Sequence, residues 1–332
     1  MRAFVTGATG FVGSHLVDAL LEQDHQVVCL VRNPRKAERL FPHRAPDIVS
    51  GDLSDESALR EGIDGADVVF HVAGITSARS RAEFFTVNTE ATRSVLRAAH
   101  AAAPALERFV LVSSLSAAGP TERGRVLTET DPPAPVSAYG RSKLAAEQAV
   151  REAPQPWTIV RPPAVYGPRD VELRRVFTFA RWGVAPVFGD GGQELTMIHV
   201  DDLVSALLAA VGSAQTAGGV YFATHPEVVT AKAFLEQVHQ TVSEIRGKSP
   251  RAPTHVPLPH WLVRAFLAAS WAGARLTGRA TVLSPDKADE FLAPSWACSP
   301  AALEGSTGWK ARIALAEGLE QTARWYRDQG YL

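Results

Sequence analysis

Cysteine and methionine are scarce in this chain of 332 residues, with two of each. Cys29 and Cys298 are far apart in the sequence, and neither has CxxC or metal-ligand spacing, so we expect no disulfide framework and no metal site. Cys29 lies in the apolar run VVCLV, which predicts a buried small hydrophobic residue. This use of cysteine fits a reducing compartment, and we expect a cytoplasmic location.

Long apolar runs and an excess of charge are also lacking. No stretch approaches about 18 uninterrupted apolar residues, so no membrane-spanning helix is expected. The first predicted strand begins at Ala3 or Phe4, which leaves no room for a secretory signal peptide. Lys and Arg number 34, Asp and Glu number 35, and the net charge is -1. Without a basic excess, nucleic acid is not an expected partner.

Helical and strand-like segments alternate through the first half of the chain, which predicts repeated β-α-β units and hence an α/β fold. Short apolar runs predict strands at 3–6, 27–31, 47–50, 67–72, 108–113, 157–161 and 220–223. Residues with helical periodicity predict helices at 11–23, 83–102 and 137–153. The expected architecture is a Rossmann fold, a doubly wound parallel sheet with helices on both faces.

Prolines and glycines become frequent after Pro162, and the β-α alternation loosens. This change predicts a smaller C-terminal substrate lobe that is interleaved with the sheet domain. We expect residues 1–165 plus about 196–224 to form the dinucleotide-binding domain, and about 166–195 plus 225–332 to form the substrate-binding lobe.

The segment TGATGFVG follows the first strand and opens the first helix, the context of a dinucleotide-binding loop. Gly7 permits a tight turn, Gly10 lets backbone N–H groups approach a pyrophosphate, and Gly13 allows close helix packing. The N-terminus of the helix then faces the phosphate charge. The residues expected to bind the cofactor here are Gly7, Thr9, Gly10, Phe11, Val12 and Gly13.

The second strand ends in LVRNPRK, which places Arg32 where NAD-binding proteins usually have an acidic residue. A guanidinium at that position favours the 2'-phosphate of NADP(H). NAD(H) stays open as the alternative, because Arg32 could also stack on adenine or face water.

Tyr139 and Lys143 stand four residues apart on a predicted helix, so their side chains share one face. A nearby ammonium would lower the pKa of the tyrosine and make it a general acid or base. Ser114 ends the fifth strand at the carboxyl edge of the sheet, where its hydroxyl could orient a substrate oxygen. Ser113 competes with it, but strand alternation points the two serines to opposite faces.

The chain as a whole resembles an extended short-chain dehydrogenase/reductase, a member of the NAD-dependent epimerase/dehydratase superfamily. The motifs that carry the resemblance are TGATGFVG, GDL (51–53), HVAG (71–74), VSS (112–114), YGRSK (139–143), RPPAVYGP (161–168) and HVDDL (199–203). It implies that Ser114, Tyr139 and Lys143 carry catalysis, and that Tyr139 and Lys143 also contact the cofactor. It further implies that the remaining cofactor contacts come from Asp52, Leu53, Ala73, Gly74, Pro163 and Val165. A homodimer is the family-level expectation.

Two segments bear on the branch of the family. Nucleotide-sugar epimerases and dehydratases usually have RDF within GDGxQxRDFIHVDD, and the Arg binds substrate phosphates. Here Leu195, Thr196 and Met197 stand in its place. The C-terminal half instead resembles the 3β-hydroxysteroid dehydrogenase and dihydroflavonol-4-reductase-like branch. Five apolar residues there could wall an apolar pocket or pack in an ordinary core: Trp261, Leu262, Phe266, Leu267 and Trp271.

The sequence therefore predicts an NAD(P)(H)-dependent ketone reductase or secondary-alcohol dehydrogenase for a mainly apolar, steroid-, flavonoid- or polyketide-like small molecule. One alternative is a nucleotide-sugar epimerase or dehydratase with tightly bound NAD, in which Arg174, Arg175 or Arg181 would supply the missing charge. Another is a non-catalytic regulator that senses NADP. Contact of the helix near Trp261 with a membrane surface is not expected, because Arg264 and Arg275 are the only nearby cations.

Overall fold

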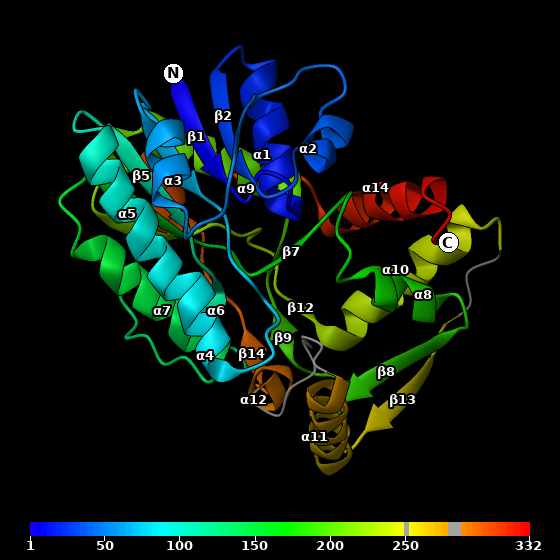
Figure 1. The fold of residues 1–332 in the computed structure, drawn as a ribbon. Helices are drawn as coiled ribbons and strands as arrows, with labels where there is room; N and C mark the ends of the chain where they lie inside the picture. The colour runs from blue at the N-terminus through cyan, green and yellow to red at the C-terminus, as the bar shows by residue number, and fades with distance from the viewer. Residues whose placement is uncertain (249–251, 278–286) are drawn as a thin grey trace.

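A seven-stranded parallel sheet forms the centre of the molecule, in a computed structural model that describes residues 1–248, 252–277 and 287–332 (Figure 1). Its strand order is β11-β6-β5-β4-β1-β2-β3, and every adjacent pair is parallel. The strands are β1 (Arg2–Thr6), β2 (Gln26–Val31), β3 (Asp47–Ser50), β4 (Val68–His71), β5 (Arg108–Val112), β6 (Trp157–Arg161) and β11 (Gly219–Phe222). The predicted α/β Rossmann class is confirmed.

Helices cover both faces of this sheet because its strands are apolar on both sides. On one face, Val5 and Cys29 pack against α1 (Phe11–Glu22) and α9 (Val200–Gly212). On the other face, Phe4 and Val28 pack against the helices α3 (Glu56–Ile63), α5 (Ala91–Ala102) and α7 (Ala138–Arg151). Neighbouring strand residues thus belong to different cores, as the alternation of side chains requires. Cys29 is buried, as predicted.

The predicted helix over residues 83–102 has a more complex form. It consists of α4 (Arg81–Phe84), a π-helical turn η1 (Phe85–Glu90) and α5. The π-turn carries Asn88, whose side chain accepts a hydrogen bond from Ile75 N at 2.8 Å and donates one to Ser142 Oγ at 3.0 Å. The wider turn thereby ties the helix to the loop after β4 and to α7. Two further helices, α2 (Pro34–Leu40) and α6 (Leu115–Ala118), lie in the sheet domain.

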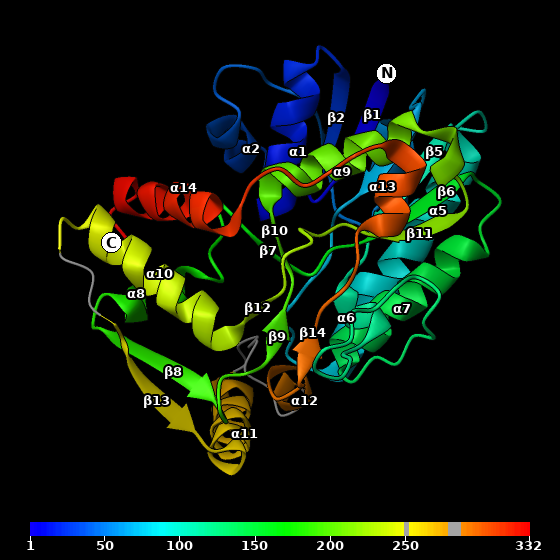
Figure 2. The same ribbon diagram turned by 180° about the vertical axis from the view of Figure 1, so that it is seen from behind.

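The chain leaves the sheet domain after β6 and builds a second group of elements, seen on the right of Figure 1 and from behind in Figure 2. Two small sheets pair β7 (Ala164–Tyr166) with β10 (Met197–His199), and β8 (Val184–Phe188) with β13 (Thr254–Leu258). A third has the order β12-β9-β14 and contains Val229–Thr230, Glu194–Leu195 and Ser295–Trp296. The helices of this region are α8 (Arg174–Ala180), α10 (Ala231–Ile245), α11 (His260–Thr277), α12 (Ala288–Phe291) and α14 (Leu315–Asp328).

The C-terminal segment returns to the sheet domain before it ends in the second group. Leu303, on α13 (Ala301–Thr307), and Trp309 belong to the same core as α1 and α9. The carboxylate of Asp202, in the HVDDL motif, accepts hydrogen bonds from the backbone N–H groups of Arg312 and Ile313 at 2.9–3.1 Å. The motif therefore fixes the returning chain against α9.

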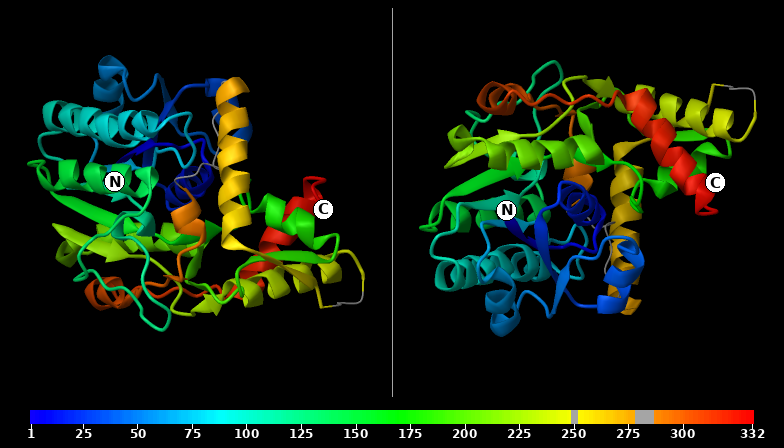
Figure 3. Two further views of the ribbon diagram at one scale, coloured as in Figure 1. Left: turned by 90° about the horizontal axis from the view of Figure 1, so that it is seen from below. Right: turned by 90° about the horizontal axis from the view of Figure 1, so that it is seen from above.

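Helix α11, shown from two sides in Figure 3, differs from the expected apolar wall. Trp261 is 69% exposed and Phe266 is 59% exposed, and Leu262 is also exposed. The buried positions are Val263 and Leu267, one turn apart, which pack with Phe188, Leu258, Ala288, Phe291 and Leu292. Core packing, one of the two predicted roles, is therefore wrong for the three exposed residues, because the helix turns a different face inward; the other role, as the wall of an apolar pocket, stays a prediction. The side chain of Arg275 lies outside the described residues.

None of the helices in the described ranges is both long enough and apolar enough to cross a membrane.

Candidate active site

The glycine loop between β1 and α1 is closed to any larger residue at two positions. Gly7 has a φ of +73°, and a Cβ there would lie 2.7 Å from the backbone N of Ala73. A Cβ on Gly13 would lie 2.1 Å from the carbonyl oxygen of Gly7. At the start of α1, Gly10 makes no side-chain cap, so the N–H groups of the first turn remain available to an anion. This cradle fits a pyrophosphate.

A buried chain of hydrogen bonds supports the glycine loop. The Thr6 hydroxyl and His71 Nδ1 are 2.7 Å apart, and His71 Nε2 and the Thr92 hydroxyl are 2.9 Å apart. Thr6 Oγ1 also accepts from the backbone N–H of Ala73 at 3.3 Å. Burial and the nearby Lys143 ammonium lower the pKa of His71 to about 3, so the imidazole is neutral at ordinary pH. This role of His71 could not be predicted from the HVAG motif alone.

The residues predicted to contact the adenosine end follow β2 and β3, which are adjacent strands. Arg32 directly follows β2 and is exposed. Asp52 accepts hydrogen bonds from the backbone N–H and hydroxyl of Ser54 at 2.8 and 2.6 Å, and these bonds lower the pKa of its carboxyl group. Leu53 is half-buried beside the core of the sheet. The three residues therefore stand at one edge of the sheet.

The two serines after β5 point to different partners. Ser113 donates a hydrogen bond to Glu147 at 2.6 Å, and Glu147 forms a buried ion pair with Arg161 at 2.6 Å. Ser114 caps α6 by accepting from Ser116 N at 3.1 Å, and its hydroxyl lies near enough to Tyr139 to act on the pKa of the phenol. The structure thus brings Ser114 and Tyr139 together and turns Ser113 into the interior, as strand alternation predicted.

Tyr139 lies in the first turn of α7, which Ser137 caps by accepting a hydrogen bond from Gly140 N at 3.0 Å. Its ring packs 5.9 Å from the ring of Phe84, and the loop before α4 closes around it through Ile75 and Ala78. Burial raises the pKa of Tyr139 to about 12; the Ser114 hydroxyl opposes this change, and the carboxylate of Glu290 adds to it. The expected lowering by Lys143 was therefore wrong for this structure.

Lys143 has a different neighbourhood from the one that the sequence suggested. Its Nζ is buried and donates to the carbonyl oxygen of Val112 at 2.7 Å. Burial lowers its pKa to about 8, although Glu147 opposes the change. A Cβ built on Gly74 would lie 3.7 Å from the same Nζ, which places the ammonium beside the HVAG segment. The ammonium therefore lies between the end of β5 and the HVAG segment.

The remaining predicted cofactor residues lie on the next loop of the sheet edge. Pro163 and Val165 are half-buried, and Val165 lies in β7, whose partner β10 leads into α9. Backbone hydrogen bonding connects this segment to the predicted catalytic serine, because Leu115 N donates to the carbonyl oxygen of Pro162 at 2.8 Å.

Two charged residues that sequence reasoning missed reach this site from the second lobe. The Lys287 ammonium lies 4.7 Å from the centroid of the Tyr139 ring. It pairs with Glu290, whose other carboxylate oxygen accepts a hydrogen bond from the Ser137 hydroxyl. No motif marks these residues, and about 150 positions separate them from Ser137.

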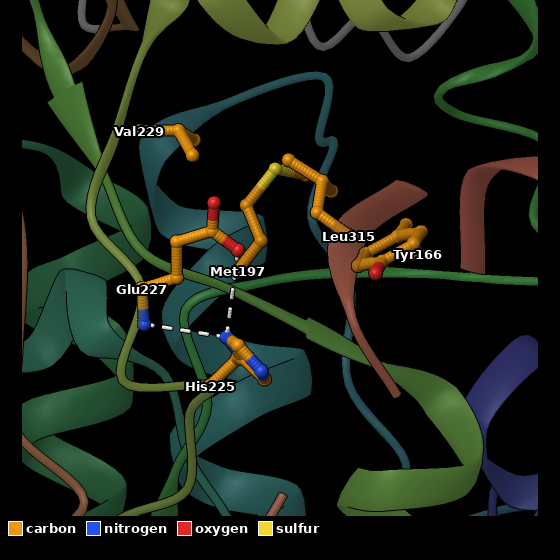
Figure 4. A pocket seen from close by; sticks show the side chains of 6 residues that line it. All are labelled: Tyr166, Met197, His225, Glu227, Val229 and Leu315. Atoms are coloured by element: carbon orange, nitrogen blue, oxygen red, sulfur yellow. Dashed lines mark hydrogen bonds and ion pairs between the residues drawn. The ribbon is translucent and has the colours of Figure 1, made fainter. Parts of the chain in front are cut away.

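Two hollows among the described residues have linings that do not include Tyr139. One is about 10 Å³, room for no more than a water molecule, and Figure 4 shows its lining of Tyr166, Met197, His225, Glu227, Val229 and Leu315. A hollow of about 370 Å³ is lined by Arg123, Gly189, Asp190, Gln193, His260, Leu292 and Pro294. Arg123 and Asp190 form a bidentate ion pair there, at 2.7 and 2.9 Å.

Known proteins resemble the chain over almost its whole length. Residues 3–222 match the model of the NAD dependent epimerase/dehydratase family. A ceramide reductase of Caulobacter vibrioides is 34% identical, over 99% of this chain and 95% of that protein. A 4-hydroxy-2-methyl-3-oxo-4-farnesyl-3,4-dihydroquinoline-1-oxide ketoreductase of Stigmatella aurantiaca is 33% identical, over 96% and 95%.

Among solved structures, MoeE5 in complex with UDP-glucuronic acid and NAD superposes with a TM-score of 0.76 at 26% identity, over 99% of this chain and 100% of that one. The glycine cradle, the residues at the sheet edge and these matches agree with one another. The chain belongs to the NAD-dependent epimerase/dehydratase family of extended short-chain dehydrogenases/reductases.

Proposed function

We propose that this protein is an NADP(H)-preferring reductase or dehydrogenase that acts on the carbonyl or secondary alcohol of a mainly apolar molecule. The contact between Ser114 and a Tyr139 that stays protonated carries the proposal. With a pKa of about 12, the phenol keeps its proton at neutral pH, which suits proton donation to a ketone.

When bound, a reduced nicotinamide supplies the hydride that attacks the carbonyl carbon. Tyr139 donates its phenolic proton to the carbonyl oxygen, so that an alcohol forms and the phenolate is reprotonated from solvent. Ser114 donates a hydrogen bond to the same oxygen and aligns it with Tyr139. Lys143 holds the cofactor beside Gly74. Residues 1–165 with about 196–224 would bind the cofactor, and 166–195 with 225–332 the substrate.

Arg32 supports the preference for NADP(H). It is exposed directly after β2, where a guanidinium can pair with a 2'-phosphate. A carboxylate at this position would instead accept hydrogen bonds from the free ribose hydroxyls of NAD.

The second lobe lacks the phosphate-binding segment of nucleotide-sugar enzymes, and this supports an apolar substrate. Leu195, Thr196 and Met197 replace the phosphate-binding segment of nucleotide-sugar enzymes. Two of the arginines that could compensate are engaged elsewhere: Arg174 lies over the Tyr331 ring at 4.6 Å, and Arg181 donates to the Tyr331 carbonyl oxygen at 3.5 Å. The names of the two relatives, a ceramide reductase and a ketoreductase of a farnesylated quinoline, also fit an apolar substrate.

A nucleotide-sugar epimerase is the second candidate, since MoeE5 binds UDP-glucuronic acid and NAD on a similar fold. Such an enzyme recycles a tightly held NAD, whereas a reductase exchanges its cofactor at each turnover. Denaturing freshly purified protein and identifying the released nucleotide by mass spectrometry separates the two. We expect NADP(H), or an empty protein that binds NADPH more tightly than NADH. Near-stoichiometric NAD would favour the epimerase.

Multiple-turnover oxidation of NADPH with long-chain or ring ketones tests the reaction itself. Turnover would exclude a regulator without catalytic activity. Failure with every ketone by a protein that binds NADPH would overturn the proposal.

A further inference from the structure

Lys287 and Glu290 form an almost buried ion pair that the chemistry proposed above does not use. Their side chains are 11% and 10% exposed. Removing two charges from water has a large desolvation cost for each ion, and the attraction between the two ions often only offsets this cost. A pair of this kind is therefore weak evidence for a stabilising role, and its position in the site becomes the informative observation.

That position is fixed from both sides. On one side, Glu290 accepts the hydrogen bond of Ser137, the residue that caps the helix of Tyr139. On the other, α12 is anchored by Ala288 in the apolar cluster of α11 and by a 2.8 Å hydrogen bond from Trp296 Nε1 to the carbonyl oxygen of Glu290. The Lys287 ammonium is thus held over the Tyr139 ring, with Glu290 beside it.

If a ketone oxygen binds to the Tyr139 hydroxyl, the substrate atoms next to the carbonyl would lie beside the Tyr139 ring. Any polar group beside the carbonyl carbon would then meet Lys287 and Glu290. An ammonium has three N–H donors and a carboxylate about four acceptor sites, so each can serve a ligand in addition to its present partner. The pair offers a donor and an acceptor side by side while its net charge is zero.

We propose that Lys287 and Glu290 form a recognition pair for an amide group adjacent to the reacting carbonyl. The inference rests on the proposed reductase function. The amide oxygen would accept from Lys287, and the amide N–H would donate to Glu290. A carboxylate at the same place would compete with Glu290 for Lys287 and would put two negative charges together, so it would bind poorly.

Three ketones of equal chain length test this: a 2-acetamido-3-ketone, a 3-oxoalkanoate and a plain 3-ketone. For the wild-type protein we expect kcat/KM to be about tenfold higher for the amide than for the plain ketone, the value of about one hydrogen bond to a charged group. Lys287→Met should remove that advantage through KM, so that the amide and the plain ketone have equal kcat/KM.

Glu290→Gln gives the sharper test, because it leaves the Lys287 ammonium without its counter-charge. The carboxylate substrate should then improve by about tenfold relative to the amide, an inversion that a merely structural role would not produce. Asp289→Asn is the matched control: this exposed neighbour pairs with Arg264 at 2.8 Å, and its loss should leave all three substrates unaffected.

Each outcome decides the inference. An equal loss on all three ketones in Lys287→Met, or an unchanged ratio of carboxylate to amide in Glu290→Gln, would overturn it while the proposed function stands. If the wild-type protein binds NADPH and reduces none of the three, the proposed function fails and this inference falls with it. NADPH affinity and circular dichroism of each variant report whether the fold is retained.

Discussion

The proposed cofactor end and the proposed substrate end of this molecule are built in different ways. At the cofactor end, backbone atoms leave no room for a side chain: a Cβ on Gly13 would lie 2.1 Å from the carbonyl oxygen of Gly7. At the substrate end, long side chains such as Lys287 and Glu290 meet Tyr139 from a distant part of the sequence. Backbone geometry preserves one ligand class across a family, whereas side chains let the second ligand vary. The predictions below test this contrast.

Tyr139→Phe should have the largest effect, because the ring stays and the proton donor is lost. We expect turnover to fall by about 10²- to 10⁴-fold, the usual contribution of general acid catalysis. The affinity for NADPH should be almost unchanged. Steady-state kinetics and fluorescence titration with NADPH measure the two quantities. Retained turnover would show that another group donates the proton.

Gly13→Ala should damage the cofactor end by crowding the backbone. We expect a destabilisation of about 1–3 kcal/mol and an accompanying loss of NADPH affinity. Gly305→Ala is the control, because this glycine lies in α13 with nothing within 4 Å of its Cβ direction. It should be neutral or stabilising by up to about 1 kcal/mol. Urea unfolding measures both, and equal stability of the two variants would refute the contrast.

The buried His71 should make the cofactor end sensitive to acid. Its folded pKa of about 3 lies below the usual value of 6.5, so the unfolded chain binds a proton that the native protein does not. Stability should therefore fall by about 1.4 kcal/mol for each pH unit between 6.5 and 3. His71→Asn should show a shallower decline in urea unfolding over this range. Parallel curves for the two proteins would contradict the assignment.

Arg32→Glu should have the smallest effect and change only the choice of cofactor. The loss of a charge-assisted contact at an exposed site should weaken NADPH by about tenfold while NADH is unchanged or improved. Arg35→Glu, on the exposed start of α2, serves as the control for a general charge effect. If both variants weaken NADPH equally, Arg32 has no specific role in binding the 2'-phosphate.

The same contrast explains what the sequence could predict. The sheet follows from short apolar runs, and the glycine cradle follows from a motif whose geometry depends on the backbone alone. The proximity of Ser114 to Tyr139 follows from strand alternation and helix spacing. The raised pKa of Tyr139 could not be predicted from the sequence, because it depends on burial and on the carboxylate of Glu290, which is 151 positions away. The sequence also could not predict which face of α11 is buried, because Trp261 and Leu267 are both apolar and the pattern does not distinguish them.

The return of the C-terminal segment to the sheet has a consequence for synthesis. Leu303 and Trp309 belong to the same core as α1 and α9, and Trp309 Nε1 donates to Ser205 Oγ at 2.8 Å. A ribosome must therefore add roughly a hundred residues after α9 before that helix is covered, which takes about 5–20 s at typical bacterial and eukaryotic rates. During this interval the nascent chain exposes an apolar helix face, and a chaperone that binds such faces would meet the protein there.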